Sequence, residues 1–219
     1  MRALPTVTFY FDPISPYVWL ASKHIARIEA AGADVRFEPI LFAGLLNAHG
    51  QKGPAEIAAK RVYTFRDVMR EAARMELPFR GPPGHPFNPL QALRMCRALD
   101  DQAERRRFAM AVFAASWEDG DDVSALPTLL ALASQCDLDG DALARAAAEA
   151  ALKQALADDT ARAIADGVFG VPTFRLGDEL FWGGDRIDAL LACLAGQHID
   201  EAKLQRFLAL APSAVRKPA

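Results

Sequence analysis

Ser15, which is followed by Pro16 and Tyr17, is the first residue in the chain whose type and setting could do chemistry. Ser before Pro is typical of a helix start, with Ser as the N-cap and Pro in the first helical position. The same hydroxyl could donate a hydrogen bond to a sulfur anion, because the amide groups and dipole of a helix N-terminus favour negative charge. Since Ser forms no disulfide, that sulfur would come from outside the turn. Both interpretations can hold together.

Val171-Pro172, directly before an apolar run, is the second such feature. One interpretation is a cis peptide bond, which is a feature of tight turns. The backbone N–H and C=O of Val171 would then be free to pair with an extended, peptide-like ligand, as in the addition of a short strand. The alternative is an ordinary trans proline at the start of an edge strand.

Gly183-Gly184-Asp185 is the third feature. In one interpretation Asp185 caps the last helix. In the other, the two glycines expose backbone N–H groups at a helix N-terminus, which is a ready site for a carboxylate. The pattern alone does not separate the two.

The three cysteines, Cys96, Cys136 and Cys193, are odd in number, lie far apart and form no CxxC pair. This spacing excludes a disulfide framework, a zinc-finger-type site and a dithiol redox motif. We therefore expect them to be buried apolar residues. The four histidines show no HExxH pattern or close pairing, so we expect surface or loop roles for them and no metal site.

Length and charge set the class of protein. The chain has 219 residues, of which 52% are hydrophobic, so it can form one sizeable core without disulfides or metals. The net charge is −3, which argues against nucleic acid and anionic membranes as partners. No uncharged run approaches the roughly 20 apolar residues of a membrane span. The first residues lack the layout of a signal peptide, and we expect a cytoplasmic protein.

The first quarter of the chain predicts a β-α-β unit. Residues 7–11 and 35–40 are typical of strands, and residues 17–31 carry apolar residues at helical spacing up to Gly32. This order implies a parallel strand pair with a right-handed crossover.

The rest of the chain predicts a helical block and then a second unit with strands. The expected helices span residues 55–75, 90–99, 104–117, 126–133 and 142–166, the last stretch holding two helices. Two strands, 173–176 and 179–182, flank a hairpin turn at Gly177-Asp178. Helices are expected at 185–194 and 199–210.

A βαβ unit joined to an αββα unit is the thioredoxin arrangement. We therefore predict an α/β, thioredoxin-like fold with a large all-helical insertion between its halves. The thioredoxin-like domain would comprise residues 1–50 and 155–219, and the insertion would span about 51–154. Redox enzymes of this fold place a CxxC motif in the turn after the first strand, where this chain has Ser15.

Several side chains are expected to have structural roles only. The three tryptophans are more typical of a core than of a pocket: Trp19, Trp117 and Trp182. Arginines four residues apart indicate a solvated helix face: Arg66, Arg70 and Arg74. The alternative is that Arg66 or Arg70 binds a substrate carboxylate.

An ordered set of motifs resembles the 2-hydroxychromene-2-carboxylate isomerases, which are related to kappa-class glutathione transferases and to disulfide oxidoreductases of the thioredoxin superfamily. The motifs run through nearly the whole chain: FYFDPISPYVWLA at 9–21, PFN at 86–88, ASW at 115–117, GVFGVPTF at 167–174 and FWGGDR at 181–186. No single motif is decisive, but the ordered set is specific.

The resemblance implies glutathione as cofactor. Ser15 would donate a hydrogen bond to its sulfur and favour the thiolate. Val171, before cis-Pro172, would pair with the cysteinyl backbone. Gly184 and Asp185 would hold the γ-glutamyl end, with Asp185 binding the ammonium group.

Four further positions are candidate site residues, and the resemblance implies the first two. Lys60 matches a residue near the glycyl carboxylate, and Gln51 stands where relatives often have Asn, with a reach longer by one methylene. Tyr17 and Asn88 are candidate substrate contacts, although Asn88 is first typical of a helix cap. The resemblance also implies a homodimer.

The implied reaction interconverts 2-hydroxychromene-2-carboxylate and trans-o-hydroxybenzylidenepyruvate, or a similar aromatic 2-oxo acid, by reversible addition of a thiolate. Addition turns the C=C bond into a single bond, which permits rotation. One alternative is a kappa-class-like transferase that conjugates electrophiles, and another is a non-catalytic, thioredoxin-like binding module. The lack of a Cys near Ser15 argues against a dithiol oxidoreductase.

Overall fold

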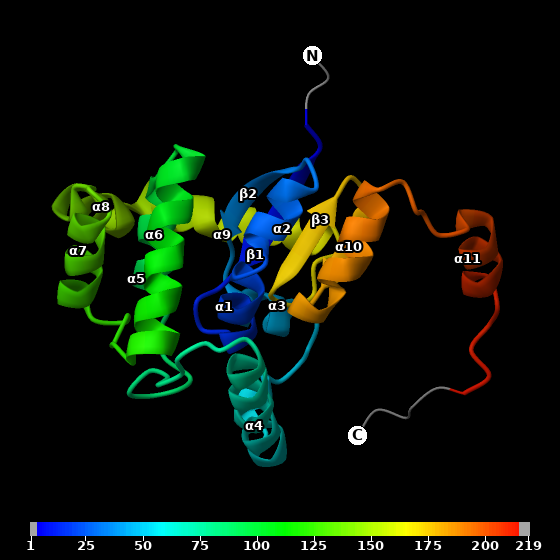
Figure 1. Ribbon diagram of the computed structural model, residues 1–219, viewed down its shortest axis with the longest axis horizontal. Helices are drawn as coiled ribbons and strands as arrows, with labels where there is room; N and C mark the ends of the chain where they lie inside the picture. The colour runs from blue at the N-terminus through cyan, green and yellow to red at the C-terminus, as the bar shows by residue number, and fades with distance from the viewer. Residues whose placement is uncertain (1–3, 215–219) are drawn as a thin grey trace.

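Four strands form one mixed sheet at the centre of the protein (Figure 1). The computed structural model describes residues 4–214. The strand order is β2-β1-β3-β4, with β1 and β2 parallel and the other neighbours antiparallel. The strands are β1 (Thr6–Phe11), β2 (Asp34–Pro39), β3 (Thr173–Leu176) and β4 (Glu179–Trp182). The parallel pair and the two-residue hairpin, in which Leu176 pairs with Glu179, are confirmed.

The helices surround this sheet and fill the middle of the chain. In chain order they are α1 (Pro16–Ser22), α2 (Ile25–Ala30), α3 (Phe42–Ala48), α4 (Ala58–Arg74), α5 (Leu90–Ala98), α6 (Gln102–Ala114), α7 (Leu126–Gln135), α8 (Gly140–Ala148), α9 (Ala150–Ala165), α10 (Ile187–Leu194) and α11 (Glu201–Leu208). Shorter turns of helix lie at Pro54–Glu56, Ala115–Asp119 and Gly184–Arg186.

The arrangement is the predicted thioredoxin-like fold with a helical insertion. Helices α2 and α10 lie over the near face of the sheet in Figure 1, α5 to α8 gather at one side, and α4 projects below. Helix α9 returns to the sheet, where it contacts β2, α3 and α5. The boundary at 51–154 stays a prediction, and residues 1–3 and 215–219 of the predicted domain lie outside the described residues. Among the residues described, no helix is long and apolar enough to span a membrane.

Aromatic side chains of β1 join the sheet and the insertion into one core. Phe9 and Phe11 are fully buried. Phe9 stacks on Phe174 of β3 with ring centroids 4.8 Å apart, and Phe11 meets Phe113 of α6 edge-on at 5.3 Å. Such pairs add to the free energy gained from apolar burial. The insertion is therefore packed against the strand that leads to Ser15.

One expectation about the first helices is wrong, and one helix was missed. The helix predicted over 17–31 is divided into α1 and α2. Ser22 Oγ donates to Trp19 O at 2.7 Å, and the N–H groups of Lys23 and His24 bond to carbonyls three residues back. These contacts tighten the chain into a turn and end α1. Helix α3, at Phe42–Ala48, was not predicted at all.

Candidate active site

A cleft of about 540 Å³ opens between α1, α4 and the connection from β4 to α10. Residues of these three elements and of the turn before β3 form its walls. The lining residues are Tyr17, Leu20, Ala21, His24, Asp67, Glu71, Arg74, Met75, Val171, Pro172, Trp182, Gly183, Gly184, Asp185 and Arg186. The cleft thus brings together five predicted site residues: Tyr17, Val171, Pro172, Gly184 and Asp185.

Ser15 lies half-buried in the turn between β1 and α1. Its N–H donates to Asp12 O at 3.1 Å, and its C=O accepts from Val18 N–H at 3.0 Å. Ser15 occupies the N-cap position of α1, but its side chain makes no capping hydrogen bond. The capping interpretation therefore holds for the backbone only. Within residues 4–214 the hydroxyl has no recorded partner, and it is available to an external one.

Asp12 holds the Ser15 turn from inside the protein. Its carboxylate is fully buried and accepts hydrogen bonds from Ile14 N–H at 3.0 Å and from Phe42 N–H, at the start of α3, at 2.9 Å. Burial raises the pKa of this carboxyl to about 7, while the two N–H donors oppose the shift. We did not predict this residue. An Asp two residues before the amide that it binds is the signal of an Asx-turn.

Two side chains of the insertion hold the same turn from outside. Trp117 Nε1 donates to Pro13 O at 3.0 Å, and His85 Nε2 lies 2.9 Å from Ile14 O. Because a carbonyl only accepts, Nε2 carries the proton of neutral His85, and Nδ1 is a buried acceptor without a partner among the described residues. Burial lowers the pKa of His85. The histidine lies in a loop, as expected, but packs there against Trp117, with ring centroids 5.6 Å apart.

Val171 and Pro172 line the cleft beside the loop at Gly183–Arg186. Their peptide bond is cis, as predicted. Neither the N–H nor the C=O of Val171 bonds to another residue in the described part of the chain. Pro172 O accepts from Gly183 N–H at 2.9 Å, which ties the third motif to the second. The backbone of Val171, two residues before β3, is therefore open to a peptide-like ligand.

The loop at Gly183–Arg186 is held by close packing. Gly183 has a φ of +102°, which favours glycine. A Cβ on Gly184 would lie 3.3 Å from Ala21 Cβ, which is a tight contact, so glycine favours the close packing of the loop on α1. The Asp185 side chain is 72% exposed and pairs with Arg186 at 3.3 Å. It makes no capping bond to α10, so that interpretation is not supported.

Trp182 corrects a prediction made for all three tryptophans. Trp19 and Trp117 are fully buried, as expected. Trp182 lies at the cleft with 53% of its surface exposed, and it meets Phe169 edge-on with ring centroids 5.0 Å apart. The strand ends at Trp182, and its indole lies against Gly170, where an added Cβ would come within 2.6 Å of Nε1. A strand residue at this edge therefore faces the cleft.

Charged and polar groups of α1 and α4 face each other across the cleft. Tyr17 donates to Asp67 Oδ2 at 2.9 Å, and burial, with this carboxylate adding to it, raises the pKa of Tyr17. The phenol stays protonated at neutral pH. Arg74 pairs with Glu71 at 2.7 Å. Burial lowers the pKa of His24, which also lines the cleft.

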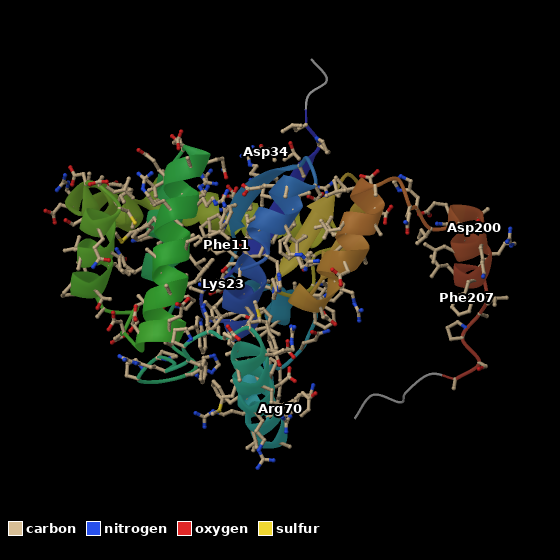
Figure 2. The ribbon with its side chains drawn as sticks, in the orientation of Figure 1. Phe11, Lys23, Asp34, Arg70, Asp200 and Phe207 are labelled. Atoms are coloured by element: carbon tan, nitrogen blue, oxygen red, sulfur yellow. The ribbon has the colours of Figure 1, made fainter. Side chains whose placement is uncertain are left out.

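Of the three arginines predicted to lie on a solvated helix face, one lines the cleft. Arg66 and Arg70 are exposed and do not line the cleft, and Figure 2 shows Arg70 on the projecting α4. Arg74, one turn further along, does line it. Arg74 and Arg186 are the cationic groups of the described lining residues, beside the carboxylates of Asp67, Glu71 and Asp185.

Four predicted site residues are not among those that line the cleft. Ser15 lies just before the helix that contributes Tyr17. Gln51, Lys60 and Asn88 are exposed. Asn88 Oδ1 accepts from Leu90 N–H at 3.0 Å, which is the capping role weighed for it. The binding roles of all four stay predictions.

Known proteins are similar to this chain in sequence and in fold. The family model of the DSBA-like thioredoxin domain matches residues 6–195. The 2-hydroxychromene-2-carboxylate isomerase of Sphingobium xenophagum is 30% identical over 188 residues, which is 84% of this chain and 95% of the relative. The chain belongs to the DSBA-like thioredoxin family and, within it, to the 2-hydroxychromene-2-carboxylate isomerases.

Two further matches agree with this assignment. A solved 2-hydroxychromene-2-carboxylate isomerase superposes with a TM-score of 0.81 at 24% identity, over 94% of this chain and 100% of that one, which shows the shared fold. Human glutathione S-transferase kappa 1 is 25% identical over 213 residues, 90% of this chain and 94% of the relative. The resemblance and the fold class are confirmed. The transferases are related, but they are the less similar group.

This chain has no cysteine in the turn after β1, where redox enzymes of the same fold have their CxxC motif. Its three cysteines are free and buried, as expected. Burial raises the pKa of Cys96 to about 12 and also raises that of Cys136 and Cys193. None lines the cleft. A thiolate in the cleft would have to come from a bound molecule.

Proposed function

We propose that the protein is a glutathione-dependent isomerase that interconverts 2-hydroxychromene-2-carboxylate and trans-o-hydroxybenzylidenepyruvate, or a similar aromatic 2-oxo acid. The observation that carries the proposal is the unpartnered hydroxyl of Ser15, in the turn where related oxidoreductases have a cysteine. The names of the relatives supply the reaction.

The residues present fit glutathione as a peptide with charged ends. Val171 offers a free N–H and C=O to a peptide backbone. Asp185, with its exposed carboxylate, suits the γ-glutamyl ammonium, and Arg186 and Arg74 suit carboxylates. Lys60 and Gln51, both exposed, are proposed for the glycyl end on the resemblance alone.

Glutathione, when bound, supplies a thiol that can add reversibly to the conjugated carbon and so permit rotation about the former double bond. Ser15 donates a hydrogen bond that holds the sulfur in its anionic form. Asp12, His85 and Trp117 keep the Ser15 turn in position. Val171 and Asp185 orient the peptide, and Tyr17 presents its ring while its hydroxyl is held by Asp67.

A kappa-class-like transferase is the second candidate, because the human transferase matches nearly the whole chain. The same Ser15, Val171 and Asp185 would serve it, and only the fate of the thiol adduct differs. Elimination returns the thiol in an isomerase, whereas a transferase keeps the sulfur bound to carbon. On the resemblance we also propose a cytoplasmic homodimer and Asn88 as a substrate contact.

An absorbance assay of chromene-2-carboxylate isomerisation tests the proposal. We expect turnover with reduced glutathione, and only the background rate without thiol or with S-methylglutathione, which can bind but has no thiol. Glutathione should not be consumed over many turnovers. Equal rates with and without the thiol contradict the proposal. Stoichiometric loss of thiol with an electrophile, without isomerisation, would favour the transferase.

A further inference from the structure

Three potential metal ligands meet at the end of the sheet opposite to the Ser15 turn, in residues that do not line the cleft. Glu179 begins β4, Cys193 lies in the last turn of α10, and His198 lies between α10 and α11. Glu179 is half-buried, Cys193 is buried and His198 is exposed. The sequence gave no signal for a metal site here. Zinc motifs usually combine two closely spaced pairs of Cys or His, and no second pair lies near Cys193 and His198.

The distances between the three ligand atoms are those of a shared metal ion. Cys193 Sγ lies 3.5 Å from His198 Nδ1 and 3.6 Å from Glu179 Oε1, and Nδ1 lies 3.4 Å from Oε1. Tetrahedral zinc, with Zn–S of about 2.3 Å and Zn–N and Zn–O of about 2.0–2.2 Å, sets such atoms about 3.3–3.6 Å apart. The N···O separation is longer than a good hydrogen bond, which falls at about 2.7–3.2 Å.

The local backbone brings His198 back to Cys193. Gly196, at a φ of +88°, ends α10, and its N–H donates to Cys193 O at 2.9 Å. Gln197 N–H donates to Ala192 O at 3.0 Å. This pair of bonds reverses the chain after the helix. The imidazole is thereby placed over the thiol and beside the first residue of β4.

The charges around the cluster favour a cation. The three side chains lie on a groove of about 1300 Å³ between the sheet edge and α11. Its lining includes the carboxylates of Asp178, Glu179 and Glu201 but, over the described residues, no Lys or Arg. The groove and the cleft share no lining residue.

We propose that Glu179, Cys193 and His198 form a zinc(II) site, with a fourth coordination position open to the groove. Thiolate, imidazole and carboxylate are all zinc ligands, and three protein ligands with one open position is a known zinc arrangement. The ion joins β4, α10 and the connection to α11. Helix α11 otherwise stands apart from the body, with Asp200 and Phe207 well away from the sheet (Figures 1 and 2). Zinc therefore fixes the base of this arm.

Metal titration of the full chain tests the site. The protein is stripped with a chelator and titrated calorimetrically with zinc in a thiol-free buffer, because glutathione itself binds zinc. We expect one equivalent per chain and a rise in the melting temperature. Cobalt(II) should give the intense near-ultraviolet band of a thiolate ligand. No binding at micromolar zinc overturns the proposal.

His198→Ala is the deciding variant, because the side chain is exposed and its loss should leave the fold intact. We expect zinc affinity to fall at least tenfold, as it should in Glu179→Gln and Cys193→Ala. His49→Ala and Cys136→Ala are matched controls with unchanged affinity. Equal affinity in His198→Ala and the wild type means that zinc binds elsewhere and overturns the proposal. Glutathione-dependent turnover should be the same in His198→Ala and the wild type, which separates this site from the cleft.

Discussion

The two loops of the candidate active site are held in different ways. The Ser15 turn is fixed from three sources: the buried carboxylate of Asp12, the indole of Trp117 and the ring of His85. The loop at Gly183–Arg186 has a backbone bond to Pro172 and close packing of glycine on α1, and its Asp185 is open to solvent.

This difference indicates that the two loops have different roles. A group that must hold a reactive atom needs a position defined by packing and hydrogen bonds around it. A group that captures a charged end of a ligand can be exposed, because its contribution is a screened attraction in water. The Ser15 turn fits the first role, and the Asp185 loop fits the second.

Ser15→Ala should have the largest effect on activity. A hydrogen bond to a charged group contributes about 1.5–3 kcal/mol, so kcat/KM should fall about 10- to 100-fold. Stability should stay within about 0.5 kcal/mol, because the hydroxyl bonds to no described residue. Steady-state kinetics and thermal unfolding measure the two effects.

Ser22→Ala is the matched control for that variant. Its hydroxyl is buried and donates to Trp19 O. The change should cost about 1 kcal/mol of unfolding free energy and leave kcat/KM as it was. If Ser15→Ala instead loses stability and activity together, Ser15 serves the helix and not the sulfur.

Asp12→Asn should have the next largest effect, on stability and its pH dependence. The amide offers one oxygen to two N–H donors, so one donor loses its partner at a cost of about 1–3 kcal/mol. The folded pKa, about 7, lies above that of an unfolded Asp. The stability that this carboxyl contributes is therefore full at low pH and is lost as pH rises from about 4 through about 7.

Urea unfolding at several pH values checks this effect. The wild type should lose stability between about pH 4 and pH 7 relative to Asp12→Asn, whose profile lacks that component. Parallel profiles for the two proteins would show that Asp12 does not titrate as its burial requires. If Asp12→Asn is as stable as the wild type, Asp12 does not hold the Ser15 turn, and the proposed difference between the two loops is wrong.

Asp185→Asn should have the smallest effect, confined to binding. An exposed ion pair contributes at most about 1 kcal/mol, so the KM for glutathione should rise about three- to fivefold while kcat stays within about twofold. Raising the salt concentration should shrink the difference. Asp178→Asn, an exposed carboxyl outside the cleft, is the control. A fall in kcat larger than the rise in KM would show that Asp185 acts in the reaction step. That result would contradict the proposed difference between the Ser15 turn and the Asp185 loop.

The sequence predicted local features of this molecule well. Residues 7–11 and 35–40 have the composition of buried strands, and Gly177-Asp178 is a hairpin signal that acts within four residues. The cis bond before Pro172 and the position of Ser15 also follow from short motifs in a recognised order. Each of these features depends on neighbours in the chain.

Features that depend on distant packing could not be predicted. His85 reaches the Ser15 turn across 71 residues of sequence, and Trp117 across 104. Arg74 lines the cleft because it shares a face of α4 with Asp67 and Glu71, whereas Arg70 lies on a neighbouring face. Periodicity locates the face of a helix but not the partner that it meets.

The exposure of Trp182 gives the protein a built-in optical reporter. The chain has three indoles, of which two are sealed in the core, while Trp182 stands at the mouth of the cleft beside Phe169. Emission on the long-wavelength side of the fluorescence band comes mainly from the solvent-facing indole. Quenching or a spectral shift of this emission would follow the arrival of a peptide or an aromatic acid in real time, without a label and without turnover.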